Sequence, residues 1–177
     1  ASKAELVGFG MSNSKLDRFR YWIDLNYFKS MDKVLTREKH NLRNKFTVLF
    51  VGRFSNIKGL KEIFSAIPEI ENSHPDVIFV FVGAPSERLS SLGYRLKRNI
   101  MVVDKVPRTE LPKYYNAADI FLLPSYSEGC PLSLLEALCC NLYSISTDVG
   151  GIPNIKRKIE ELELIKSRDS LALSDSV

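Results

Sequence analysis

The sequence has few cysteines and histidines and no long apolar run. Its 177 residues include three cysteines and two histidines. The odd number of cysteines, two of them adjacent at Cys139 and Cys140, argues against a disulfide framework, and no paired metal-ligand spacing is present. Because no apolar run approaches the roughly 18 residues that cross a bilayer, we expect no transmembrane helix. These absences favour a globular domain in a reducing compartment, without a bound metal.

Strong charge of either sign is absent as well. Lysine and arginine number 25 and the acidic residues 21, which gives a net charge of +4 at pH 7. A nucleic-acid-binding surface usually gathers its basic residues on one stripe, whereas here they are scattered and the tightest cluster is residues 156–158. We therefore predict no nucleic-acid partner. A phosphate on a small ligand, or an anionic lipid, suits this mild positive bias better.

Strand patterns and helix patterns alternate from about residue 46 onward. Continuous apolar, β-branched runs are typical of strands buried on both faces, and each is followed by an amphipathic stretch. Alternating units of this kind build a parallel, doubly wound sheet, so we predict a Rossmann-like α/β domain. The predicted strands are 46–51, 77–82, 100–103, 120–123 and 142–146, and the predicted helices are 58–70, 86–97, 109–117 and 131–140.

The two ends of the chain do not follow this pattern. Residues 12–44 mix aromatic and charged side chains without a clear period, and the pattern weakens again after Gly151. We interpret residues 1–44 as a linker and strap from an interdomain region, and residues 45–177 as a ligand-binding domain. Because residues 167–177 read as the start of a further element, we expect this domain to be truncated at its C-terminal side and cut from a longer chain.

The loop after the first predicted strand carries two cations. Ligands of open parallel sheets bind at the carboxyl ends of the strands, and here Arg53 and Lys58 stand among glycines that let a ligand approach the backbone. This arrangement suits a pyrophosphate. A surface ion pair for Arg53 and an ordinary helical role for Lys58 are the alternatives. A lysine in a first helical turn opposes the helix dipole at a cost of a few tenths of a kcal/mol, which favours the phosphate role.

Two glutamates eight residues apart form the second candidate group. Glu128 lies in the loop after the fourth predicted strand, and Glu136 lies in the helix that follows. A loop carboxylate can face a sugar, and a helical one can accept two hydrogen bonds from a ribose diol. Both could instead be solvated. The neighbours of Glu136 are mostly leucine and alanine, and burying an unpaired carboxylate among them would be costly, which favours a functional purpose for Glu136.

These motifs together resemble the C-terminal domain of the group 1 glycosyltransferases, a retaining family of the GT-B fold that uses nucleoside-diphosphate sugars. The resemblance covers roughly residues 22–154. It is centred on the segment PSYSEGCPLSLLEA at 124–137, which carries the Glu-x7-Glu spacing of the family. The other matching segments, in chain order, are 23–28, Gly52-Arg53 with Lys58-Gly59, 114–119 and 147–153.

The resemblance implies a role for each candidate residue at the donor site. Glu128 would be the catalytic residue that contacts the donor sugar near the reacting carbon, and Glu136 would bind the ribose hydroxyls. A helix that begins near Pro131 would direct its N-terminal dipole at the diphosphate and stabilise the leaving group without a metal. The remaining positions would bind the donor: Arg53 and Lys58 its diphosphate, Lys105 and Val106 its base, and the backbone of Gly129, Cys130, Pro131 and Leu132 its sugar and phosphates.

The resemblance also implies what the whole protein does. The donor would be a UDP- or GDP-sugar, with no further cofactor, and the sugar would pass to an acceptor hydroxyl with retention, as in a hexosyltransferase. The partner would be the N-terminal acceptor domain of the same parent, without which we expect the isolated domain to be inactive. We expect a cytoplasmic location, with peripheral contact at the inner face of the membrane for a lipid acceptor. Departures from the family pattern at Cys130, Pro131, Asn141 and Asn154 leave the identity of the sugar open.

Two alternatives belong to other classes. Gly8-x-Gly10 after Leu6-Val7 hints at the dinucleotide loop of an oxidoreductase, but Asn13 stands where the third glycine belongs. A non-catalytic nucleotide-sugar-binding module is the second, since a fold can persist after its chemistry is lost. The four side chains Arg53, Lys58, Glu128 and Glu136 argue against that loss.

Overall fold

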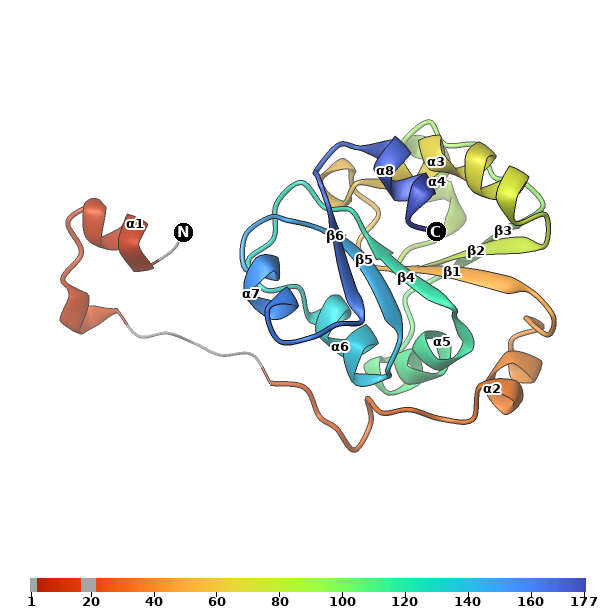
Figure 1. The fold of residues 1–177 in the computed structure, drawn as a ribbon, viewed down its shortest axis with the longest axis horizontal. Helices are drawn as coiled ribbons and strands as arrows, with labels where there is room; N and C mark the ends of the chain where they lie inside the picture. The colour runs from red at the N-terminus through yellow and green to blue at the C-terminus, as the bar shows by residue number, and fades with distance from the viewer. Residues whose placement is uncertain (1–2, 17–21) are drawn as a thin grey trace.

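The chain folds around one six-stranded parallel sheet. The computed structural model describes residues 3–16 and 22–177. Strand order is β3-β2-β1-β4-β5-β6, with helices on both faces (Figure 1). All five strand pairs are parallel, which confirms the predicted doubly wound sheet. The strands are β1 (Phe46–Val51), β2 (Val77–Val82), β3 (Ile100–Val103), β4 (Ile120–Leu123), β5 (Tyr143–Thr147) and β6 (Leu162–Ile165).

Two groups of helices cover the sheet. Helices α3, α4 and α8 lie over one face, and α5, α6 and α7 lie over the other (Figure 1). No helix in the described ranges is long and apolar enough to cross a membrane. The helices are α1 (Lys3–Gly8), α2 (Lys33–Lys39), α3 (Leu60–Ser73), α4 (Ser86–Ser91), α5 (Leu111–Ala117), α6 (Leu132–Cys139), α7 (Ile152–Lys156) and α8 (Ser170–Asp175).

One part of the core lies where β1 and β2 meet α3. Phe50 of β1 and Phe81 of β2 are almost completely buried, with ring centroids 5.9 Å apart. Phe64 of α3 stacks on Phe81 at 5.3 Å. Burial of one such side chain contributes about 1.5–3 kcal/mol. Because β1 and β2 are buried on both faces, their sequences read as continuous apolar runs, and their predicted bounds are correct.

Several predicted helix bounds are wrong, each for a local reason. Lys58 does not begin a helix: residues 56–58 form a short 3-10 turn, and Gly59 at φ 71° separates that turn from α3. The helix predicted over 86–97 ends at Ser91, before Gly93 at φ 86°. The helix predicted over 109–117 is divided into a 3-10 turn at Arg108–Glu110 and α5. Pro131 caps α6 instead of occupying its first position.

The predicted strap contains α2, which packs against α5. Residues 1–2 and 17–21 of the predicted 1–44 segment lie outside the described residues. Just before α2, Met31 donates its backbone N–H to Asn116 Oδ1 (2.7 Å), and Asn116 Nδ2 donates to Lys29 O (3.0 Å). Phe28 is buried against Tyr115 of α5. These contacts attach residues 28–39 to the helical layer that also carries Glu136.

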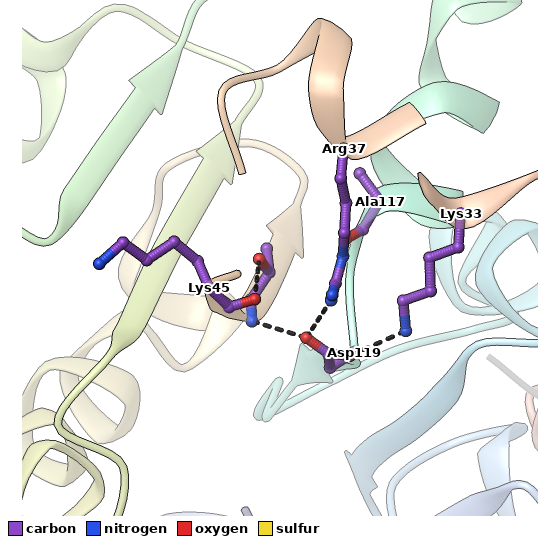
Figure 2. Close-up of polar contacts among 6 residues, drawn as sticks. Lys33, Arg37, Lys45, Ala117 and Asp119 are labelled. Atoms are coloured by element: carbon purple, nitrogen blue, oxygen red, sulfur yellow. Dashed lines mark hydrogen bonds and ion pairs between the residues drawn. The ribbon is translucent and has the colours of Figure 1, made fainter. Parts of the chain in front are cut away.

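Asp119 joins this strap to the sheet. Its carboxylate accepts hydrogen bonds from Lys33 Nζ (2.8 Å), from an Arg37 Nη and from the backbone N–H of Thr47 (2.8 Å), as Figure 2 shows. Arg37 also donates its Nε–H to Ala117 O at 2.9 Å. Burial alone would raise the pKa of Asp119, but the hydrogen bonds and the two cations outweigh it, and the pKa of this carboxyl is lowered.

We expect Asp119→Asn to lower the free energy of unfolding by about 1–2 kcal/mol, because a charged acceptor of three donors becomes neutral at a partly exposed site. A carboxyl with a lowered folded-state pKa stabilises the fold above its unfolded pKa, and this contribution is lost as pH falls. The difference between wild type and variant in urea unfolding should therefore be full above about pH 5, should begin to shrink below the ordinary aspartate pKa of about 3.9, and should be lost only when pH falls below the lowered folded-state pKa. Lys33→Ala, at the more exposed partner, serves as the control and should cost less than about 1 kcal/mol. A difference that does not shrink at all between about pH 5 and pH 2.5 would contradict this account.

Candidate functional site

Lys58 and Glu128 meet where the strand order reverses. Lys58 lies in the loop after β1 and Glu128 in the loop after β4, and these strands are neighbours. The distance from Lys58 Nζ to Glu128 Oε1 is 2.6 Å, and both side chains are largely buried. Ser125 donates its hydroxyl to the same carboxylate oxygen at 2.7 Å. Crevices at such reversal points are the ligand sites of open parallel sheets.

The loops after β1 and β4 are held against each other by backbone contacts. Tyr126 donates its backbone N–H to Ile57 O at 2.8 Å. A Cβ at Gly59 would lie 1.9 Å from Pro124 O, so only glycine allows this approach. Tyr126 also donates its hydroxyl to Glu62 at the start of α3, with 2.8 Å to each carboxylate oxygen, and its pKa is raised to about 12 by burial and by that carboxylate. The position of Lys58 relative to Glu128 is therefore fixed by the backbone and not by the ion pair alone.

The loop after β5 supports Glu128 from the other side. Gly150 adopts φ 58°, and a Cβ there would lie 1.6 Å from Glu128 O. The next residue, Gly151, donates its N–H to Gly129 O at 3.0 Å. Thr147, at the end of β5, donates its hydroxyl to Ser125 O at 2.5 Å. The predicted glycine segment at 147–153 therefore supports the site through contacts with the backbone of the loop after β4.

Glu136 is buried in α6 and has two side-chain partners. Tyr115 of α5 donates its hydroxyl to Oε2 at 3.0 Å. Arg108 donates its Nε–H to Oε1 at 3.0 Å, and one of its Nη atoms lies 2.9 Å from the same oxygen. Burial raises the pKa of Glu136, against the opposing effects of the Tyr115 hydrogen bond and the Arg108 charge. The buried carboxylate is therefore paired within the protein, and the purpose predicted for it stays a prediction.

The residues between the two glutamates form the turn into α6. Pro131 is buried at the N-cap position and makes no side-chain capping bond, so the first N–H groups of the helix are left without a side-chain acceptor. Gly129 is exposed, Cys130 and Leu132 are half-buried, and burial raises the pKa of the Cys130 thiol. This turn lies between Glu128 and Glu136, where a ligand that spans both carboxylates would pass.

The other predicted residues are not brought into contact with these side chains. Arg53 is exposed and makes no ion pair within the described ranges. It lines a shallow depression of about 580 Å³ with Arg88, between the loops after β1 and β2. Lys105 is exposed after β3, and Val106 packs partly against the core. Their predicted contacts with a diphosphate and a base stay predictions.

Three side chains of this region were not predicted from the sequence as site residues: Arg108, Tyr115 and Ser125. Ser125 could have been found, since it lies just beyond β4 and three residues before Glu128. Arg108 lies in the loop after β3, beyond the two positions predicted to border a base. The partnership of Tyr115 with Glu136 depends on how α5 packs against α6, and no spacing in the sequence indicates it.

Two further expectations can be compared with the fold. The Gly8-x-Gly10 segment begins at the last residue of the short helix α1 and does not follow a strand, so the strand-turn-helix unit of a dinucleotide site is not formed there. In the part of the chain that the structure describes, no three His, Cys, Asp or Glu side chains gather as metal ligands would. The polar groups at this edge of the sheet are instead Lys58, the carboxylates of Glu128 and Glu136, and the N-terminus of α6.

Comparison with known proteins agrees with this arrangement. A family model described as "Glycosyl transferases group 1" matches residues 32–177. The putative teichuronic acid biosynthesis glycosyltransferase TuaC of Bacillus subtilis is 36% identical over 129 residues, which cover 73% of this chain and 31% of that protein. This chain spans about a third of the length of the curated relatives it matches.

Solved structures give the same result for the fold. Sucrose-phosphate synthase from Thermosynechococcus elongatus superposes with a TM-score of 0.76 at 28% identity, over 86% of this chain and 40% of that one. Anabaena HepE in complex with UDP-glucose gives a TM-score of 0.80 at 18% identity, over 98% of this chain and 50% of that one, and shows the fold alone. The prediction of a Rossmann-like half of a GT-B fold is confirmed.

Proposed function

Because this chain belongs to the group 1 glycosyltransferases, we propose that it is the donor-binding half of an enzyme that transfers sugar from a nucleoside-diphosphate sugar to an acceptor hydroxyl. The observation that carries the proposal is the contact of Lys58 with Glu128 at the reversal of strand order. A cation beside a carboxylate, next to an uncapped helix start, suits a ligand that carries both phosphates and a polar sugar.

Lys58 is proposed to hold the donor diphosphate. Its ammonium group has three N–H donors, and Glu128 accepts one of them at 2.6 Å. Two donors therefore remain for phosphate oxygens. Arg53 would approach the diphosphate from the exposed side of the same loop. Glu128, held by Lys58 and Ser125, would then face the donor sugar, which is why we assign it the catalytic position.

The rest of the donor is proposed to lie along the start of α6. The backbone from Gly129 to Leu132 would approach the sugar and the phosphates, and the helix dipole would stabilise the diphosphate as it leaves, in place of a metal. Glu136 would accept hydrogen bonds from the ribose hydroxyls. Lys105 and Val106, in the loop after β3, would border the base.

The acceptor half is proposed to lie outside the present sequence. Relatives about three times as long leave room for it. We expect the present chain to bind donor without transferring sugar, and the whole enzyme to transfer a hexosyl group with retention. A cytoplasmic location, with peripheral membrane contact for a lipid acceptor, stays a prediction.

Titration with UDP, GDP, ADP and NAD by isothermal calorimetry tests the proposal directly. UDP comes first because the HepE complex contains UDP-glucose. Saturable binding of one nucleoside diphosphate, without binding of NAD, is the expected result. Binding of NAD alone would favour the oxidoreductase alternative. Binding of a diphosphate by a parent enzyme without any transfer would favour a non-catalytic module.

We expect Glu136→Gln to remove most of the preference for ribonucleotides over 2′-deoxyribonucleotides. A hydrogen bond to a charged acceptor contributes about 1.5–3 kcal/mol, so the wild-type ratio of dissociation constants should be at least about tenfold and should fall to about twofold in the variant. Calorimetry with UDP and 2′-deoxy-UDP measures both ratios. Glu69→Gln, at an exposed position of α3, is the matched control. An unchanged ratio in Glu136→Gln would place the ribose elsewhere.

A further inference from the structure

The hydrogen-bond capacity of Glu136 is nearly used up within the protein. A carboxylate offers about four lone-pair positions. The Arg108 guanidinium occupies Oε1, where its Nε–H donates at 3.0 Å and one of its Nη atoms lies 2.9 Å away, and the Tyr115 hydroxyl donates to Oε2 at 3.0 Å. One position is left. A ribose diol donates two hydrogen bonds and therefore cannot bind this carboxylate fully while all these contacts persist.

The two partners of Glu136 differ in their freedom to move. Tyr115 is completely buried, and its ring packs edge-on against Phe28 and Phe121 with centroids 6.2 and 5.7 Å away. Withdrawing its hydroxyl would require repacking of the core between α5 and the sheet. The Arg108 side chain is 54% exposed and follows Pro107 in a short turn. Arg108 is therefore the partner that can leave.

The strap supplies the surface on which Arg108 rests. The guanidinium carbon lies 5.3 Å from the centroid of the Phe28 ring, within the range of a cation–π contact. Phe28 is itself buried and is held near α5 by the backbone bonds of Lys29 and Met31 to Asn116. The guanidinium thus has two contacts, one with the Phe28 ring of the strap and one with the carboxylate of Glu136.

We propose that Arg108 is a displaceable occupant of the ribose-binding side of Glu136, and that it sets how strongly this protein discriminates ribonucleotides from 2′-deoxyribonucleotides. The inference rests on the proposed function, since it assumes that Glu136 binds ribose. A ribonucleotide must break the Arg108 contact to donate from both hydroxyls. A 2′-deoxyribonucleotide donates only from its 3′-hydroxyl and can use the one free position. Arg108 therefore acts as a positioning residue that weakens the discrimination that Glu136 alone would give.

Removing Arg108 should raise the discrimination. In the wild type, a ribonucleotide must break the partly exposed ion pair between Arg108 and Glu136, which should lower its affinity by about two- to fivefold. In Arg108→Ala this opposition is gone, and the ratio of the 2′-deoxy-UDP to the UDP dissociation constant should increase by about two- to fivefold. Arg108→Lys, which keeps the charge but not the planar contact of two nitrogens with Oε1, should give a ratio between those of wild type and Arg108→Ala. Arg95→Ala, at an exposed arginine away from Glu136, should leave the ratio unchanged.

The measurement is best made in alkaline buffer, at about pH 8.5, because burial raises the pKa of Glu136 and removal of Arg108 raises it further. Such a buffer favours the ionised carboxylate in every variant that retains Glu136. The other titratable groups near it are Tyr115, Cys139 and Cys140. Burial raises the pKa of all three, that of Cys140 to about 12 and that of Tyr115 well above its ordinary range.

Calorimetry with UDP and 2′-deoxy-UDP, or with the GDP pair if UDP does not bind, gives the ratio for wild type, Arg108→Ala, Arg108→Lys and Glu136→Gln. A side-chain NMR signal of the Arg108 Nε–H, assigned by its loss in Arg108→Lys, gives a second readout. It should shift on saturation with the ribonucleotide and stay in place with the deoxyribonucleotide.

A ratio of dissociation constants that is unchanged or lower in Arg108→Ala, with the Glu136→Gln effect intact, overturns this inference alone. If neither UDP nor GDP binds the wild type, or if Glu136→Gln leaves the ratio of dissociation constants unchanged, the inference is overturned together with the assumed role of Glu136.

Discussion

Gly150→Ala should strongly destabilise the protein and should also weaken nucleotide binding. Gly150 adopts φ 58°, and an added Cβ would lie 1.6 Å from the carbonyl oxygen of Glu128. Overpacking costs typically about 1–3 kcal/mol and a left-handed alanine about 1 kcal/mol more, so the free energy of unfolding should fall by about 2–4 kcal/mol. The atom that must move belongs to the backbone of the candidate catalytic residue.

The consequence for binding follows from which loop gives way. If the loop after β4 shifts, Glu128 moves away from Lys58 and Ser125, whose contacts at 2.6 and 2.7 Å leave little tolerance. A misplacement of about 1 Å is enough to cost a hundredfold in a positioned site. Nucleotide affinity at a temperature where the variant is still folded should therefore fall by at least about tenfold, a loss that reduced stability alone does not produce.

Gly93→Ala separates backbone strain from collision. Gly93 also has a left-handed φ of 86°, but a Cβ there meets nothing within 4 Å. Its replacement should cost only about 1 kcal/mol in urea unfolding and should leave the nucleotide dissociation constant unchanged. Equal losses of stability in the two variants would show that the contact between the loops after β4 and β5 is looser than the 1.6 Å approach implies.

The sheet could be predicted from the sequence because its strands are buried on both faces. Continuous apolar runs such as 46–51 and 77–82, ended by glycines and followed by amphipathic stretches, are typical of strands buried between two helical layers. The helix beginnings were harder to predict. The pattern predicts a helix that opens at Lys58, yet a single left-handed residue, Gly59, turns the chain before α3 begins. Composition does not reveal such a turn, because glycine is compatible with several conformations.

The candidate site, like the fold, could be predicted from the sequence only in part. That Lys58 and Glu128 share one edge follows from parallel topology, since every strand of such a sheet ends on the same side. The ion pairing of Glu136 with Arg108 does not follow from it. This contact requires α5 to pack against α6 and a strap residue, Phe28, to lie beneath the guanidinium. The strap has no periodicity, so its path over the domain could not be predicted from its sequence.

Under the proposed function, Lys58→Ala should weaken nucleoside-diphosphate binding by roughly ten- to a hundredfold. A charge-assisted hydrogen bond contributes about 1.5–3 kcal/mol, and Lys58 has two donors left for phosphate oxygens. Calorimetry with the nucleotide that binds the wild type measures the change. Lys61→Ala, at an exposed lysine three residues later on α3, should leave affinity within about twofold, because surface charges act weakly.

A second substitution distinguishes the phosphate role of Lys58 from its role as the partner of Glu128. Lys58→Ala alone leaves the largely buried Glu128 carboxylate with only the Ser125 hydroxyl, which should lower the free energy of unfolding by about 1–3 kcal/mol. Adding Glu128→Gln removes the uncompensated charge and should restore most of that stability. Nucleotide affinity should stay low in the double variant, because the phosphate loses the same cation in both. Recovery of affinity together with stability would mean that Lys58 acts on the donor only through the fold of this loop, and the diphosphate would then have to be held by Arg53 and the start of α6.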